Sequence, residues 1–335
     1  MNAALPPPPI GLPVPSSWYC LGLGRDLPPG GLWRRSLAGR ALVVVRTRSG
    51  QVGALDAHCP HLGADFTVGG TIEGDLLRCP FHGFCFDLSG ACVSTPYGHK
   101  APPAARAGTC SVIERHGLLL AWHGSQGEPP AFDIPDADMT GWTHWREHVF
   151  ELRGHPQEVA ENGVDFGHFA AIHGYDAVQA TEPLQTDGPT LRAAYRFRRP
   201  RGLRGQGALD TEIAILQQGL GYALVEAHVT NLGVRTRQLV LALPLGDDRL
   251  QLRIAPSVDH KLEPRRVHPL LAWLPGAWLA ERLANRALQG YIEDVAQDLP
   301  IWQNKIHLSR PALAAGDGPI GPYRKWVRQF YPERP

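Results

Sequence analysis

Two short segments of this sequence each pair one cysteine with one histidine. The first reads Cys59-Pro-His61-Leu-Gly and the second reads Cys79-Pro-Phe-His82-Gly, with seventeen residues between His61 and Cys79. Thiolates and imidazoles gathered four at a time are ligands for a transition metal. The set suits a [2Fe–2S] cluster that takes two cysteines on one iron and two histidines on the other. We therefore predict that these four residues hold such a cluster.

A structural zinc site is the competing interpretation, because zinc accepts the same four ligands. Zinc sites more often take two cysteines from one knuckle and two histidines from one helix. Here each segment supplies one residue of each kind. The mixed pattern therefore favours the cluster over zinc.

A second group of ligand-type side chains lies in residues 161–173, among mostly apolar neighbours. The group consists of Asn162, Asp165, His168 and His173. We expect one helix over residues 156–172, on which the four would share an arc of about 140°. Two histidines on such a helix are more often core or capping residues. The nearby carboxylate and the upstream cluster motif instead favour the two-histidine, one-carboxylate site of non-haem iron enzymes.

The elements that must position these groups differ between the two parts of the chain. Short strands joined by tight turns are expected over residues 18–122, and residues 124–140 are rich in Gly, Pro, Gln and Asp. Further strands are expected at 145–152, 191–197, 211–216, 222–229, 238–243 and 250–254, before helical spacing returns at 270–305. We predict an α+β protein with an all-β domain over 16–123, a linker over 124–144 and a catalytic domain over 145–331. In the last, an antiparallel sheet would wrap a long C-terminal helix.

Composition limits the class of protein. The 335 residues are 43% hydrophobic and 19% charged, with a formal net charge of +1, which argues against a nucleic-acid or anionic-membrane partner. No apolar run is long enough to span a bilayer, and the N-terminus lacks the features of a signal peptide. All six cysteines fall in the first third of the chain, which indicates a local metal site in a reducing compartment. We expect a cytoplasmic protein.

The two cysteine–histidine segments resemble the Rieske family, whose pattern is Cys-x-His … Cys-x-x-His. The respiratory branch of that family carries an extra cysteine in each segment, where this chain has Ala64 and Phe81. The chain is therefore similar to the oxygenase and ferredoxin branch. The second motif of the Rieske oxygenases, Asp-x-x-His-x-x-x-x-His, is matched by Asp165, His168 and His173.

The resemblance implies a catalytic domain of the helix-grip type and a mononuclear Fe(II) held by His168, His173 and a C-terminal carboxylate. The segment Gln297-Asp298-Leu-Pro-Ile-Trp302-Gln-Asn-Lys305 resembles the family segment that supplies this carboxylate, which indicates Asp298. Asp294 lies one helical turn earlier on the same face, and spacing alone leaves both open. Asn162 is expected to line the iron cavity without binding iron. In a head-to-tail homotrimer, Asp165 would bridge His82 of one subunit and His168 of the next.

That C-terminal segment and the ending Asp317-Gly-Pro-Ile … Gln329-Phe-Tyr331 resemble 3-ketosteroid 9α-hydroxylase oxygenase components and Rieske cholesterol 7-desaturases. The resemblance implies a terminal oxygenase that uses O₂ and NAD(P)H electrons delivered by a separate ferredoxin or flavin/iron–sulfur reductase. Its substrate would be a hydrophobic, steroid-like or polycyclic molecule that is hydroxylated or desaturated. Residues 270–283 are expected either to line the substrate cavity or to form packed core or a subunit interface.

Three other functions remain open from the sequence. One is an electron-transfer and lipid-binding protein with a cluster but no oxygenase activity, against which the motif at Asp165 argues. Another is a Rieske O- or N-demethylase of a small aromatic. The third is a zinc-stabilised binding module.

Overall fold

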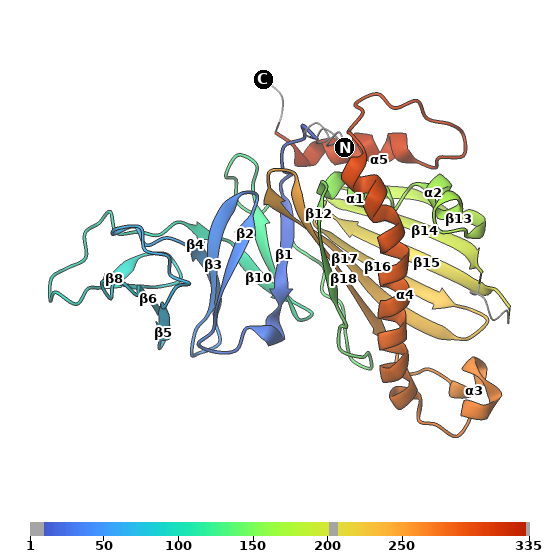
Figure 1. Cartoon of the computed structure of the whole chain (residues 1–335), viewed down its shortest axis with the longest axis horizontal. Helices are drawn as coiled ribbons and strands as arrows, with labels where there is room; N and C mark the ends of the chain where they lie inside the picture. Colours follow the sequence, from blue (N-terminus) through green and yellow to red (C-terminus); the bar gives the residue numbers. More distant parts are fainter. Residues whose placement is uncertain (1–9, 201–206, 333–335) are drawn as a thin grey trace, which may run out of the picture. The chain divides into compact units, whose positions relative to one another are not determined.

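The computed structural model describes residues 10–200 and 207–332, which form two compact units. The N-terminal unit comprises Ser16–Ala137 together with Leu243–Asp247, and the C-terminal unit comprises the other described residues. Figure 1 shows strands throughout both units and the longest helix in the C-terminal one. The predicted α+β class, with an all-β first part and a sheet with a long helix in the second, is confirmed.

The N-terminal unit contains three small sheets. The first consists of β1 (Ser17–Leu23), β11 (Leu118–His123) and β10 (Val112–Arg115). The second consists of β2 (Leu32–Leu37), β3 (Arg40–Arg46), β4 (Val52–Asp56) and β9 (Thr109–Cys110). The third consists of β5 (Thr71–Glu73), β6 (Leu76–Arg78), β7 (Cys85–Phe86) and β8 (Cys92–Ser94). The loops β4–β5 and β6–β7 carry the two cysteine–histidine segments.

Residues 124–137, within the segment expected as a linker, belong to the N-terminal unit. The indole nitrogen of Trp18 donates to the Phe132 carbonyl at 2.6 Å, and that of Trp122 donates to the Glu128 carbonyl at 2.8 Å. Ile134 is buried. This segment is therefore anchored on the strands that precede it.

The C-terminal unit is built on one seven-stranded sheet. In sheet order its strands are β12 (His148–Arg153), β18 (Arg249–Val258), β17 (Val234–Gly246), β16 (Tyr222–Val229), β15 (Leu209–Gln218), β14 (Thr190–Arg199) and β13 (Asp176–Asp187). Along β14, Leu191, Ala193, Tyr195 and Phe197 are buried while the residues between them are more exposed, which is the period-two pattern of a half-buried strand. The edge strand β13 was not expected, because almost all of its residues are exposed and its sequence shows no such alternation.

The helices are α1 (Pro156–Glu161), α2 (Phe166–Ala171), α3 (Pro264–Val267), α4 (Gly276–Asn304) and α5 (Ile320–Val327). Single 3-10 turns occur at Gly24–Asp26, Pro269–Leu271 and Arg328–Phe330. No helix within the described ranges is both long enough and apolar enough to cross a membrane.

The single helix expected over residues 156–172 is wrong. The chain leaves the helical conformation after α1, and Asp165 is extended (φ −88°, ψ 100°) and caps α2 by accepting the backbone N–H of His168. An aspartate in this conformation starts a helix, so it cannot continue the one before it. The four polar residues therefore do not share one helical face. Their side chains are positioned by the non-helical residues between α1 and α2.

Helix α4 runs across the sheet (Figure 1). Val295 and Trp302 on α4 pack in one buried cluster with Leu250, Leu252 and Ile254 of β18. The helix continues through Pro300 to Asn304. This packing fixes the C-terminal half of α4, which carries Asp298, against the sheet.

Candidate metal centres and cavity

The two cysteine–histidine segments form loops with the same backbone hydrogen bonds. The N–H of Cys59 donates to the carbonyl five residues later at 2.8 Å, and the N–H of Gly63 donates back to the Cys59 carbonyl at 2.9 Å. The second loop repeats both bonds from Cys79 (2.8 Å) and Gly83 (3.1 Å). Both glycines have positive φ, 75° and 67°, which glycine adopts without strain. The tight turn thus brings each cysteine and its histidine to the same loop tip.

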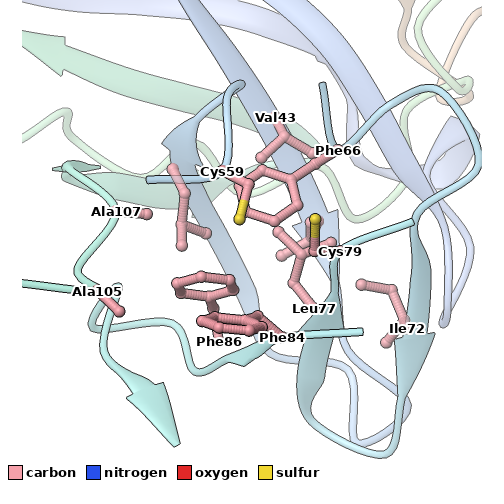
Figure 2. Close-up of a cluster of buried hydrophobic side chains, with 12 residues drawn as sticks. Val43, Cys59, Phe66, Ile72, Leu77, Cys79, Phe84, Phe86, Ala105 and Ala107 are labelled. Atoms are coloured by element: carbon pink, nitrogen blue, oxygen red, sulfur yellow. The ribbon is translucent and has the colours of Figure 1, made fainter. Parts of the chain in front are cut away.

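The four ligand-type side chains converge at the ends of these loops. Cys59 and Cys79 are buried among apolar side chains of the N-terminal unit, as Figure 2 shows. The rings of His61 and His82 lie 4.7 Å apart between centroids, edge to face. Phe84 stacks on His61 at 4.3 Å with an angle of 7° between the rings, which fixes that imidazole.

The chemistry of this donor set fits a metal cluster. Burial raises the pKa of the Cys59 thiol to about 12, a shift that the His61 backbone N–H opposes and that the neighbouring Cys79 increases. A bound cation would favour the thiolate form of Cys59 and so offset this cost. The Nδ1 atom of His82 is buried and has no hydrogen-bond partner among the described residues. Such an orphaned nitrogen is ready to bind a metal.

The second centre brings together His168, His173 and Asp298, which are 130 residues apart at the extremes. One ligand atom from each lies within 4.8 Å of the others. The Nε2 atom of His173 is 3.6 Å from a carboxylate oxygen of Asp298, and both side chains are more than nine-tenths buried. Burial lowers the pKa of both histidines, so each is neutral and can donate a lone pair.

His168 is oriented by its own helix start. Its Nδ1 lies 2.7 Å from the backbone carbonyl of Asp165, an acceptor, so Nδ1 carries the proton and Nε2 is left for a metal. The Asp165 carboxylate instead accepts the backbone N–H of His168 at 3.1 Å. The expected contact between this carboxylate and the imidazole N–H of His168 is therefore wrong within one chain, because Nδ1 faces the backbone carbonyl of Asp165 instead.

His173 is held by a residue that the sequence did not single out. The Nδ1 of His173 lies 3.4 Å from the side-chain oxygen of Gln297, the residue just before Asp298. This amide leaves Nε2 directed at the Asp298 carboxylate. The only sequence signal was its place next to the candidate ligand.

Asp294 occupies a different environment from Asp298. Its carboxylate pairs with Arg199 at 2.8 Å and accepts the Tyr175 hydroxyl at 3.0 Å. Burial raises the pKa of Asp298 to about 7, and the nearby Asp294 adds to the shift while the Asn162 side chain opposes it. Ionising the buried Asp298 carboxyl is therefore costly when no cation is near. A divalent metal bound by this carboxylate and the two neutral imidazoles would offset that cost. Of the two aspartates, Asp298 is the one that shares a group of possible metal ligands with His168 and His173 among the described residues.

A cavity of about 600 Å³ adjoins this second centre. Alternate residues of β15, β16 and β17 line it, together with positions of α4 spaced three and four apart from Leu283 to Trp302. Its lining is mostly apolar, and it includes His168, His173, Asp298 and Asn162. At about 1.5 Å per residue, Leu283 and Asp298 stand about 22 Å apart along α4. The cavity therefore extends well beyond the metal site.

The segment 270–283, expected to line the cavity or to form packed core or a subunit interface, does not lie in a single environment. Only Leu283 of that segment lines the cavity, and Leu279 and Ala280 are buried. Leu270, Trp273 and Trp278 are 76%, 80% and 48% exposed. The apolar residues of this segment therefore divide into a set that is buried or lines the cavity and a set that is exposed to solvent.

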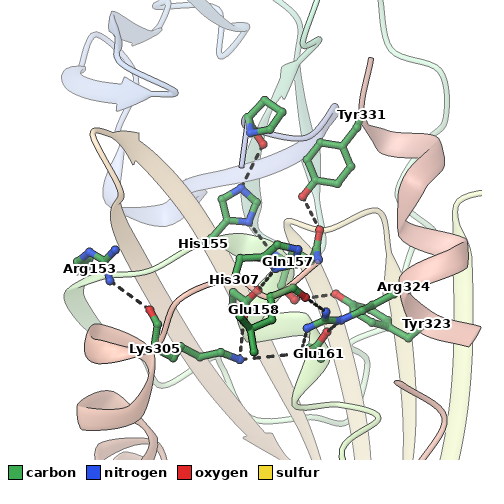
Figure 3. A network of polar contacts seen from close by, with 12 residues as sticks. Arg153, His155, Gln157, Glu158, Glu161, Lys305, His307, Tyr323, Arg324 and Tyr331 are labelled. Carbon is green, nitrogen blue, oxygen red and sulfur yellow. Dashed lines mark hydrogen bonds and ion pairs between the residues drawn. The ribbon is translucent and has the colours of Figure 1, made fainter. Parts of the chain in front are cut away.

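A buried polar network ties the segments that carry the metal-site residues (Figure 3). Glu158 on α1 contacts Lys305 at 2.5 Å and His307 at 2.7 Å, and Glu161 takes a bidentate pair from Arg324 at 2.6 and 2.9 Å. Tyr323 and Tyr331 donate to the backbone and side-chain oxygens of Gln157, both at 2.7 Å. The network holds α1 against the end of α4 and the C-terminal segment.

We expect Glu158→Gln to lower the free energy of unfolding by about 3 kcal/mol, because it leaves Lys305 beside an uncharged partner in a buried network. Although burial alone raises the pKa of Glu158, Lys305 and His307 hold it below 4.5. The stabilisation is therefore present above pH 4.5 and is lost as the pH falls through the folded-state pKa. Denaturant unfolding at pH 7 and at pH 4 measures both effects.

Glu151→Gln is the matched control, because Glu151 and its partner Arg249 are 59% and 65% exposed. An exposed pair contributes less than about 1 kcal/mol. Equal losses in the two variants would contradict a structural role for the network.

Two family models match this chain. The Rieske [2Fe–2S] domain matches residues 17–106, and the 3-ketosteroid 9α-hydroxylase C-terminal domain matches residues 121–331. The oxygenase component of 3-ketosteroid-9-alpha-monooxygenase from Rhodococcus rhodochrous is 28% identical over 94% of this chain and 80% of its own length. Cholesterol 7-desaturase of Bombyx mori is 29% identical over 99% of this chain and 72% of its own length. Cholesterol 7-desaturase 1 of Ciona intestinalis is 30% identical over 97% of this chain and 70% of its own length.

Solved structures share the fold. Dicamba monooxygenase bound to dicamba has a TM-score of 0.64 at 20% identity, covering 94% of this chain and 96% of its own. Pseudomonas putida CBB5 NdmA with caffeine has a TM-score of 0.68 at 18% identity, covering 93% and 89%. Another structure of dicamba monooxygenase contains non-heme iron.

Proposed function

This chain belongs to the Rieske oxygenases, as a terminal oxygenase component with a 3-ketosteroid 9α-hydroxylase C-terminal domain, and from that premise we propose its substrate, ligands and assembly. The chain is thus an oxidoreductase with a Rieske [2Fe–2S] domain, and a multicomponent system implies a separate reductase or ferredoxin. We propose that the enzyme hydroxylates or desaturates a steroid-like or polycyclic substrate with O₂. The observation that carries this proposal is the mostly apolar cavity that begins at His168, His173 and Asp298.

In the proposed enzyme, Cys59, His61, Cys79 and His82 hold the cluster. When bound, the cluster supplies single electrons, and an iron held by two histidines and a carboxylate supplies a centre with open positions for O₂ and substrate. The role of the chain's own residues is to orient these ligands. The Asp165 carbonyl fixes the proton of His168 on Nδ1, and Gln297 holds the ring of His173.

We propose that Asp298 is the carboxylate ligand and that Asn162 lines the cavity beside it. Asp294 is engaged by Arg199 and Tyr175, which supports this choice. Asp165 is proposed to act between subunits of a homotrimer, where its carboxylate would meet His82 of the neighbour. The proposed boundaries are 16–123 for the cluster domain and 145–331 for the catalytic domain.

The substrate class follows from the cavity and from the relatives. A cavity of about 600 Å³ with apolar residues from three strands favours a large hydrophobic molecule. The relatives named for 3-ketosteroid and cholesterol reactions match over nearly the whole chain. The structural neighbours solved with dicamba and caffeine keep a small aromatic substrate as the second candidate.

Metal and sulfide analysis tests the proposed function. We expect the purified protein to be brown and to contain about three iron and two acid-labile sulfide per chain, and the reduced cluster to give the low-average-g EPR signal of histidine ligation. Cys79→Ser should lose the colour, the sulfide and the EPR signal. With a reductase supplied, O₂ uptake should rise with a 3-ketosteroid and not with a small aromatic. About two iron per chain would indicate an electron carrier alone, and a colourless zinc protein would rule the proposal out.

A further inference from the structure

Three large apolar side chains stand exposed in the segment that leads into α4. They are Leu270, Trp273 and Trp278, with exposed fractions of 76%, 80% and 48%. We call these three residues the apolar face. Scattered exposed apolar side chains are ordinary, but three within nine residues, two of them tryptophan, mark an interaction surface.

The exposure of the apolar face does not reflect a loose segment. Leu262 and Leu279, which flank it, are buried in one cluster with Val258 of the sheet and Ala280 of α4. Leu271 packs against the same cluster. The segment is therefore anchored from inside while Leu270 and Trp273 remain outside.

The surrounding residues carry a local excess of positive charge. Residues 260–286 contain five Lys or Arg and two Glu, although the whole chain has a net charge of only +1. Both glutamates already contact arginines, Glu263 with Arg265 at 3.1 Å and Glu281 with Arg146 at 2.8 Å. Arg282 lies over the Trp278 ring, 5.0 Å from its centroid. The balanced net charge, which argued against an anionic membrane, thus conceals a basic region around the apolar face.

The apolar face also adjoins the substrate cavity. Val267 on α3, three residues before Leu270, lines the cavity, and so does Leu283 on α4, five residues after Trp278. Leu283 is about 22 Å from Asp298 along α4. The apolar face therefore borders the end of the cavity that is remote from the metal ligands.

We propose that the apolar face and its basic residues dock on an anionic lipid bilayer, so that a hydrophobic substrate passes from the bilayer into the cavity. This inference rests on the proposed function for its purpose. Tryptophan favours the boundary between headgroups and acyl chains, and Lys and Arg are attracted by anionic headgroups. The enzyme would lie on the membrane through one segment.

A second copy of the chain is a weaker candidate for covering the apolar face. The proposed trimer requires a neighbour's cluster near His168 and Asp165. Gly276 at the start of α4 and Asp298 are 22 residues apart, about 33 Å along the helix. A neighbour's cluster at the metal site would therefore contact this subunit about 33 Å from the start of α4, measured along the helix.

Vesicle cosedimentation of the holoenzyme tests the inference without any substrate. The vesicles are phosphatidylcholine alone, or phosphatidylcholine with phosphatidylglycerol at about three to one. We expect the wild type to bind the anionic vesicles about tenfold more strongly, and high salt to weaken that binding. The double variant Leu270→Ser/Trp273→Ser should bind the anionic vesicles about tenfold more weakly than the wild type. Leu313→Ser, at a residue 45% exposed elsewhere in the C-terminal unit, should change binding less than twofold.

Iron content, cluster absorbance and sedimentation velocity check that each variant is folded and keeps its oligomeric state. If the double variant does not fold, Arg282→Glu replaces it and should weaken binding to anionic vesicles alone. Absence of wild-type binding to anionic vesicles overturns the inference. A double variant with a changed oligomeric state also overturns it and assigns the face to a second copy. Failure of turnover would instead contradict the proposed function and leave the vesicle result standing.

Discussion

Asp298→Ala should remove the mononuclear iron and abolish turnover while the cluster spectrum stays unchanged. The variant deletes the only carboxylate among the described residues that shares a metal-binding group with His168 and His173. Two neutral imidazoles alone bind iron weakly, so iron should fall from about three to about two per chain. Iron and sulfide analysis with the visible spectrum measures this directly, because two iron and unchanged sulfide locate the loss at the second centre.

Asp294→Asn is the matched control for this prediction. Its side chain is one helical turn away, but it is bound to Arg199 and Tyr175 and not to either histidine. We expect this variant to keep about three iron per chain and to lose stability, since Arg199 keeps only an amide partner. Loss of iron from Asp294→Asn with retention in Asp298→Ala would move the ligand one turn along α4.

Asp165→Asn should slow cluster oxidation by orders of magnitude, with substrate and O₂ present, while the cluster and most of the iron remain. The iron is kept because the proton of His168 Nδ1 is held by the backbone carbonyl of residue 165, which the substitution preserves. An asparagine can still cap α2. What the variant lacks is the negative charge that is proposed to hold the imidazole N–H of a neighbour's His82. Stopped-flow absorbance of the reduced cluster gives the rate.

Mixed trimers give a second readout of the same prediction. Chains with Asp165→Asn keep an intact cluster, and chains with Cys79→Ser keep an intact Asp165. A trimer of both kinds should regain part of the activity wherever an intact cluster meets an intact Asp165 across a subunit boundary. If Asp165→Asn oxidises its cluster at the wild-type rate, Asp165 has no role in electron transfer and serves only as the N-cap of α2.

Local spacing was enough to predict the two cysteine–histidine loops and the buried strands. The two cysteine–histidine segments form matching loops because each contains its own glycine and its own hydrogen bonds. The buried strands were predicted because burial on one face imposes a period of two, as in β14. The exposed edge strand β13 carries no such pattern and was missed. A strand can therefore be predicted from its sequence when one of its faces is buried, and it gives no such pattern when both faces are exposed.

The parts that could not be predicted depend on contacts between distant segments. The difference between Asp294 and Asp298 depends on Arg199 and Tyr175, about a hundred residues away, which contact Asp294. Gln297 gains its role only because His173 is brought to it. Trp273 is a large apolar residue of the kind found in cores, and only the folded structure shows that its side chain is exposed.

The network that joins Glu158 and Glu161 to residues 305–331 also sets an order of maturation during protein synthesis. The four proposed cluster ligands lie before residue 83, and the N-terminal unit is nearly complete at Ala137. Arg324 and Tyr331 are made roughly 190 residues later, which at typical rates takes about 10–40 s. Glu158 and Glu161 gain their basic partners only when residues 305–324 have been made. The four proposed cluster ligands can therefore come together while the chain is still on the ribosome, whereas the candidate iron site waits for Asp298 and for this network, near the end of synthesis.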